Sequence, residues 1–185
     1  VAEHAARSGF GALALTDLGN LYALPAMADA AAERGLGCLA GAALERPNGS
    51  AIYAWALDRR GYGRLCGILS RSLASPVGLP HDALADLVAG AWDGLALATD
   101  DEAALGALAA AAPVHGDPTR PYALPFVALL SGQAMSTSAR LARRLGLPPL
   151  AVAGGRTLTD DDDELLPLLG AIDRRLTLGG LNGSS

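Results

Sequence analysis

Short apolar runs alternate along the chain with longer stretches of helical periodicity. The apolar runs predict strands at residues 12–15, 36–40, 51–57, 94–98, 124–130 and 150–153. The intervening stretches predict helices at residues 3–8, 22–34, 61–73, 81–88, 100–112 and 136–145, and a last helical region from 159 to 173. Strands that alternate with helices are typical of βα units, so we predict an α/β fold with a mainly parallel sheet.

Polar positions between these elements predict where functional groups would lie. A polar loop is expected at residues 16–20 and a turn at residues 45–50, which contain Pro and Asn-Gly. Six or seven βα repeats would close most naturally as a distorted parallel barrel, whose functional groups lie on loops after the strands. Those positions are held by Asp17, Ala42, Ala43, Asp58, Thr99, Asp100, Ser131, Gly132 and residues 154–156.

The composition is that of a folded domain. Hydrophobic residues make up 51% of the 185 residues and charged residues 18%, which excludes a disordered chain. No window of about 18 residues is free of charges, Pro and Gly, so a membrane span is not expected. The first residues read as a charged helix and not as a signal peptide, so we expect a cytoplasmic protein.

The net charge of -5 argues against direct binding of DNA. All 14 basic residues are arginine, and they form no basic stripe along the sequence. Because nonspecific DNA affinity comes from neutralising phosphates, we expect weak or no direct DNA binding. Aromatic residues, at 4%, are too sparse for a single-strand stacking platform.

Several other features have an ordinary structural interpretation. Residues 160–164 could hold a cation, but consecutive carboxylates on a helix point in different directions, which favours a solvated first turn. The Gly-Gly-Arg run at residues 154–156 could cradle an anion, although a tight turn is favoured. The histidines are scattered, and Cys38 and Cys66 lie far apart without metal spacing. No Ser-His-Asp arrangement is apparent.

The run ALALTDLGNLY at residues 12–22 resembles the "ALTDHGNLYG" segment of one known family. Residues 30–36, 58–66, 142–148 and 168–178 resemble later segments of that family, in the same order. The chain thus resembles the PHP (polymerase and histidinol phosphatase) domain of bacterial DNA polymerase III alpha-type subunits. The resemblance implies a distorted seven-stranded (β/α) barrel over residues 1–178, lacking the family's first strand, and a tail or linker at 179–185.

The same resemblance implies which positions would hold the family's zinc or manganese ions. Asp17 matches a surviving metal ligand, but the other ligand positions carry residues unsuited to the metal. These degenerate positions are Leu18, Ala43, Ala51, Ala128, Gly132, Gly154 and Arg156. Because cation affinity depends on the number and geometry of ligands, we expect no bound metal and no catalysis by this domain.

The function implied is that of a structural or subunit-docking module of a replicative or error-prone polymerase. Nucleotidyl transfer would be carried out by the remainder of the polymerase chain, and a proofreading or accessory subunit is an expected partner. The alternative is an active metal-dependent PHP phosphoesterase or 3′-5′ exonuclease, with ligands supplied by an N-terminal strand outside these residues. A third possibility is a stand-alone barrel that binds a new ligand in the emptied pocket.

Overall fold

The computed structural model describes residues 1–75, 82–89, 92–112, 125–130 and 134–152. Residues 2–153 form one compact unit, and the description below concerns that unit. Its helices are α1 (Ala2–Arg7), α2 (Leu24–Ala32), α3 (Arg59–Leu73), α4 (Ala83–Ala89), α5 (Glu102–Ala111) and α6 (Ala134–Leu145). Its strands are β1 (Ala12–Ala14), β2 (Asp17–Leu18), β3 (Gly37–Leu39), β4 (Gly41–Glu45), β5 (Ala51–Ala56), β6 (Leu95–Thr99), β7 (Phe126–Leu129) and β8 (Pro149–Ala151).

The six helices predicted within the described residues are confirmed, because their end signals lie in the sequence. Asp58 accepts a hydrogen bond from the backbone N–H of Gly61 at 2.8 Å and caps α3. Asp101 caps α5 in the same way, through the N–H of Ala104 at 3.0 Å. Beyond α1, Gly9 adopts a φ of 79°, a conformation that favours glycine at helix ends.

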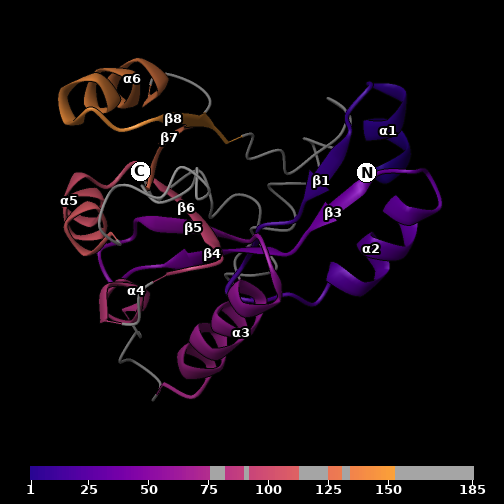
Figure 1. The fold of residues 1–185 in the computed structure, drawn as a ribbon, viewed down its shortest axis with the longest axis horizontal. Coiled ribbons are helices and arrows are strands. Elements are labelled where there is room, and N and C mark those ends of the chain that lie inside the picture. Colours follow the sequence, from indigo (N-terminus) through magenta and orange to yellow (C-terminus); the bar gives the residue numbers. More distant parts are fainter. Residues whose placement is uncertain (76–81, 90–91, 113–124, 131–133, 153–185) are drawn as a thin grey trace, which may run out of the picture. The chain divides into compact units, whose positions relative to one another are not determined.

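The strands form two sheets (Figure 1). β1 pairs with β3 in parallel, and the larger sheet has the order β2-β4-β5-β6-β7-β8. The β2-β4, β6-β7 and β7-β8 pairs are parallel, whereas β4-β5 and β5-β6 are antiparallel. The α/β prediction is therefore confirmed, and the larger sheet is mixed, with an antiparallel centre that the prediction of βα repeats did not include.

The strand β4 was missed by the sequence prediction, which placed Ala42 and Ala43 on a loop. Only Ala40 separates β3 from β4, so the chain passes from one sheet to the other without a turn signal. Gly41 makes this passage possible, since a Cβ there would lie 2.5 Å from Cδ1 of Trp55 and 2.7 Å from the carbonyl oxygen of Leu15.

The loop predicted at residues 16–20 is also partly wrong. Asp17 and Leu18 form the short strand β2, which pairs with β4. The strand before it, β1, is present but is not the buried strand that was predicted, because Ala12 and Ala14 are exposed. A two-stranded sheet leaves much of each strand open to solvent.

One face of the larger sheet packs under helices. Its strands contribute buried apolar residues that include Leu44, Ile52 and Leu97, and α4 and α5 contribute to the same cluster. From α3 the cluster receives residues at the predicted helical spacing, Leu65, Ile68 and Leu69. Leu73 is 68% exposed because it is the last residue of the helix.

No helix among the described residues is long and apolar enough to cross a membrane. Closure of the sheet into a barrel and the domain limit at residue 178 stay predictions. The helical region predicted at residues 159–173 lies outside the described residues.

The start of α3 lies against the turn before β6 through two glycines. A Cβ on Gly61 would lie 1.7 Å from the carbonyl oxygen of Gly94, which itself accepts a hydrogen bond from the N–H of Leu57 at 2.8 Å. Gly94 also has a φ of 79°. The helix can therefore approach the sheet this closely only with glycine at position 61.

We predict that Gly61→Ala lowers the free energy of unfolding by at least about 2 kcal/mol, because the methyl group forces α3 away from the carbonyl oxygen of Gly94. Gly63→Ala, two residues along the same helix, is the control. A Cβ at position 63 would meet no atom within 4 Å. That change should be neutral or stabilise by about 0.5 kcal/mol. Urea unfolding measures both, and equal effects would contradict the close approach.

Candidate functional site

The register of the larger sheet brings together the described ligand positions of the PHP resemblance. Leu18 lies opposite Ala43, and Ala43 lies opposite Tyr53. Paired residues point to the same face of a sheet, and residues two apart on one strand do so as well. Ala51, two residues before Tyr53, therefore shares this face with Leu18 and Ala43.

The remaining described position lies on the same face. Tyr53 pairs with Ala98, and Ala98 pairs with Phe126, two residues before Ala128. Alternation along the strand then puts Ala128 on the face of Phe126. We call this surface, which carries Leu18, Ala43, Ala51 and Ala128, the ligand face.

Apolar side chains fill the middle of the ligand face. Ala98, Ala128 and Val152 are buried there, with 0%, 0% and 8% exposure. They are surrounded by half-buried residues of the same kind, Tyr53, Trp55, Phe126, Leu130 and Leu150. The rings of Tyr53 and Trp55 stack with their centroids 6.2 Å apart, at an interplanar angle of 15°.

A cavity of about 380 Å³ adjoins this cluster, on the side of Trp55, Leu57 and Leu150. Its lining also includes Thr16 and is otherwise apolar. From the residues that the structure describes, the cavity therefore offers a hydroxyl group but no carboxylate, imidazole or thiolate to a cation.

The surviving candidate ligand, Asp17, lies on the other face. It is opposite Ala42, whose side chain belongs to the helix-covered core, and it is half-buried. The pleat therefore points the Asp17 side chain away from the ligand face. Sequence reasoning missed this separation because it took residues 16–20 as a loop, in which neighbouring side chains have no fixed alternation.

The described residues do not fit the family's metal site. Alanine and leucine supply no donor atom, and zinc or manganese needs several oxygen, nitrogen or sulfur ligands. Within residues 1–75, 82–89, 92–112, 125–130 and 134–152, no group of three or more His, Cys, Asp or Glu could hold a metal ion. The positions Gly132, Gly154 and Arg156 lie outside the described residues.

Two other strand-end candidates have structural roles. Asp58 caps α3, and the hydrogen bond from the N–H of Gly61 is the main reason why the pKa of Asp58 lies below its usual value. The Thr99 hydroxyl is buried, donates to the carbonyl oxygen of Ala51 at 2.7 Å and accepts the N–H of Asp101 at 3.2 Å.

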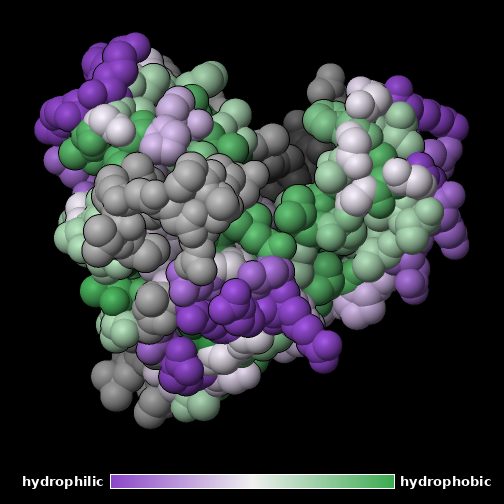
Figure 2. Space-filling model, in the orientation of Figure 1, coloured by the Kyte–Doolittle hydropathy of each residue, from purple (hydrophilic) through white to green (hydrophobic). Residues whose placement is uncertain are grey.

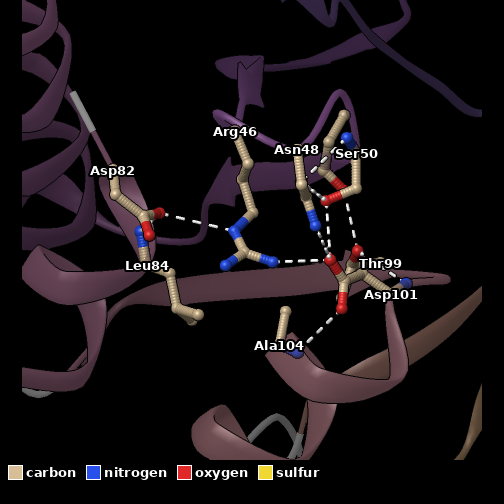
Figure 3. A network of polar contacts seen from close by, with 9 residues as sticks. Arg46, Asn48, Ser50, Asp82, Leu84, Thr99, Asp101 and Ala104 are labelled. Atoms are coloured by element: carbon tan, nitrogen blue, oxygen red, sulfur yellow. Dashed lines mark hydrogen bonds and ion pairs between the residues drawn. The ribbon is translucent and has the colours of Figure 1, made fainter. Parts of the chain in front are cut away.

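The strongest polar cluster surrounds Asp101 (Figure 3). Its carboxylate accepts hydrogen bonds from Arg46 Nη1 at 2.5 Å, Asn48 Nδ2 at 2.8 Å and Ser50 Oγ at 2.7 Å. Arg46 also reaches Asp82, with 3.3 Å between Nε and Oδ1. The Arg46 and Asp101 side chains are only 12% and 10% exposed. The cluster ties the β4-β5 turn to the start of α5.

Burial by itself would raise the pKa of Asp101. The hydrogen bonds from Asn48, Ala104 and Ser50 and the charge of Arg46 outweigh burial, and they hold the pKa far below its usual value. The turn at residues 45–50 was predicted from the sequence. Its contact with the start of α5 was not, because Arg46 and Asp101 are 55 residues apart.

The chain matches no protein-family model and no curated protein. It is similar to the crystal structure of a protein from Bifidobacterium adolescentis, described as a "putative metal-dependent phosphoesterase". The TM-score is 0.49 and the sequence identity 14%, over 87% of this chain and 86% of that chain. This distant likeness is one of α/β architecture.

We predict that Asp101→Asn lowers the free energy of unfolding at pH 7 by about 2–3 kcal/mol, because it leaves Arg46 without a buried anion. A carboxylate with a lowered folded-state pKa stabilises the fold above the unfolded-state value, near 4, and this contribution is lost as the pH falls below it. The difference between wild type and variant should therefore shrink from pH 5 towards pH 2. Urea titrations at several pH values measure it.

The control is Asp100→Asn, which removes a neighbouring carboxylate outside the cluster. It should change stability by less than about 0.5 kcal/mol at pH 7. A pH profile of Asp101→Asn parallel to that of wild type would contradict the role assigned to the cluster.

Proposed function

We propose that this chain is a PHP-like domain whose ligand face has become an apolar packing surface, so that the domain is structural and not catalytic. One observation carries the proposal. The four described positions at which the resemblance implies metal ligands share one face of the sheet, and they are occupied by Leu18, Ala43, Ala51 and Ala128.

The chemistry explains why these substitutions abolish a metal site. Hydrolysis in metal-dependent phosphoesterases depends on cations that activate water and neutralise the phosphate. Ala128 is fully buried in an apolar cluster. A cation bound there would be taken out of water without a ligand, which is costly. Burial of the apolar residues at the middle of the ligand face instead stabilises the fold, whereas Leu18 at its edge is 60% exposed.

The proposed setting is a DNA polymerase III alpha-type chain, and the ordered sequence resemblance from residue 12 to residue 178 supports it. In that setting the remainder of the polymerase chain performs nucleotidyl transfer. This domain supports the fold of the polymerase chain and docks a proofreading or accessory subunit. The same resemblance supports closure of the sheet into a distorted barrel.

The competing function is that of a metal-dependent PHP phosphoesterase or 3′-5′ exonuclease. It requires ligands from residues other than the four on the ligand face, because those four supply none. A direct test of metal and activity separates the two functions.

We predict that the purified chain, incubated with Mn²⁺ or Zn²⁺ and then desalted, retains far less than one metal ion per molecule. It should not hydrolyse phosphate esters or single-stranded DNA above background. Asp17→Asn should change neither result, because that carboxylate points away from the ligand face. Elemental analysis and both assays give the readout. Stoichiometric metal with activity would establish the competing function.

For the docking role, we predict that the chain co-purifies with the proofreading or accessory subunit of an alpha-type polymerase. The association should persist in the presence of EDTA, because it depends on protein surface and not on metal. An unrelated protein of similar net charge serves as the control bait. Equal recovery on both baits would contradict the docking role.

A further inference from the structure

A cavity of about 400 Å³ runs along α3, on the helix-covered side of the sheet and away from the ligand face. Three arginines of α3 line it, Arg60, Arg64 and Arg71. Ile68, Leu87 and Trp92 supply apolar surface. Figure 2 shows hydrophilic side chains gathered over α3. Asp86 lines the cavity as well, so the cavity combines three guanidinium groups and one carboxylate with an apolar wall.

The spacing of these arginines places them in one row. Residues four and seven positions apart return to the same side of an α-helix, so Arg60, Arg64 and Arg71 project along a single stripe. Gly63 and Gly67 occupy the positions between them. A Cβ on Gly63 would meet nothing within 4 Å, and one on Gly67 would meet only Arg71, at 3.7 Å. The glycines therefore leave open space beside the guanidinium groups.

Two residues that line this cavity carry a buried donor with no hydrogen-bond partner among the described residues. One donor is the indole Nε1 of Trp92, whose side chain is 2% exposed, and the other is Nη1 of Arg64. Buried polar groups in folded proteins are nearly always hydrogen-bonded, so two such donors lining the same cavity require an explanation.

The charges of the cavity are only partly neutralised. Arg71 is paired with Asp86, with 2.8 Å between Nε and Oδ2. In the part of the chain that the structure describes, no carboxylate forms an ion pair with Arg60 or Arg64. Asp58 lies near both, and its carboxylate is engaged in the cap of α3.

We infer that this cavity binds the phosphate group of a small organic phosphate. Guanidinium and indole N–H groups are donors only, so their partner must be an acceptor, and the three arginines outnumber the carboxylates of Asp58 and Asp86, which favours an anion. Phosphate oxygens can accept from Arg64 and Trp92 together once the two side chains turn their buried donors towards the cavity, while Arg60 supplies charge. Ile68 and Leu87 are placed to contact the organic part. The volume lies within the range of small-molecule sites, about 300–1,000 Å³.

This inference is independent of the proposed function, since the cavity shares no residue with the ligand face. If phosphate does not bind in the cavity, the proposed function still stands, and if the proposed function fails, the inference about the cavity still stands.

The two tryptophans of the chain make a direct test possible. Trp55 belongs to the ligand face and Trp92 to the cavity. In ¹H–¹⁵N spectra of the full chain, assigned with Trp92→Phe, phosphate binding should shift the indole N–H signal of Trp92 and leave that of Trp55 in place. The probes are inorganic phosphate, phenyl phosphate and, as the control anion, acetate. We expect phenyl phosphate to bind most tightly and acetate least.

Calorimetry on variants measures the contribution of each donor. Arg64→Gln should weaken phenyl phosphate binding about tenfold or more, and Trp92→Phe, which keeps an aromatic ring but removes the donor, about threefold to tenfold. Arg143→Gln, on the exposed surface of α6, is the matched control and should leave the affinity unchanged. Circular dichroism verifies that each variant folds. If the Arg64→Gln variant does not fold, calorimetry on the Arg60→Gln variant is used in its place.

Three outcomes would overturn the inference. The first is no saturable shift of the Trp92 signal at millimolar phosphate or phenyl phosphate, which would mean that water fills the cavity. The second is equal weakening by Arg64→Gln and Arg143→Gln, which would mean nonspecific attraction. The third is acetate binding as tightly as phenyl phosphate, which would contradict the ligand class.

Discussion

The register of the β4-β5-β6 ladder is the constraint on which the rest of the structure depends. Ala43, Tyr53 and Ala98 form one row across the three strands, and Leu44 with Ile52 forms a row on the opposite face. A slip of one residue would exchange the two faces and expose the helix-covered core. Both faces are apolar at the centre, so patterning alone discriminates weakly between registers.

Polar contacts supply that discrimination at the end of the ladder. Arg46 and Asp101 join the β4-β5 turn to α5, and the Thr99 hydroxyl bonds the first residue of β5. A buried ion pair gives little net stability, because desolvation offsets the attraction, but its partners satisfy each other only in one alignment. The cluster therefore fixes position more than it adds free energy. The same alignment puts Ala43, Ala51 and Ala128 on one face.

The sequence predicted local structure well and long-range contacts poorly, for physical reasons. The cap at Asp58 and the apolar spacing along α3 are local signals, and the helix appeared as predicted. The strand β4 has no turn before it, since the crossing between sheets needs only the missing side chain of Gly41. Asp17 was grouped with Leu18 as one motif, but a two-residue strand separates them onto opposite faces. None of these pairings is encoded by neighbours in the chain.

The two sides of the larger sheet differ in how they treat polar groups. On the ligand face, the side chains of Leu18, Ala43, Ala51 and Ala128 supply no donor atoms, and the cluster around Ala128 is apolar. Along α3, by contrast, Trp92 and Arg64 keep buried donors that a purely structural surface would have lost or paired. Unpaired buried donors carry a desolvation cost, and an apolar residue of similar size would avoid it. An anion bound in the cavity beside α3, as inferred above, would offset this cost, whereas the ligand face carries no such cost.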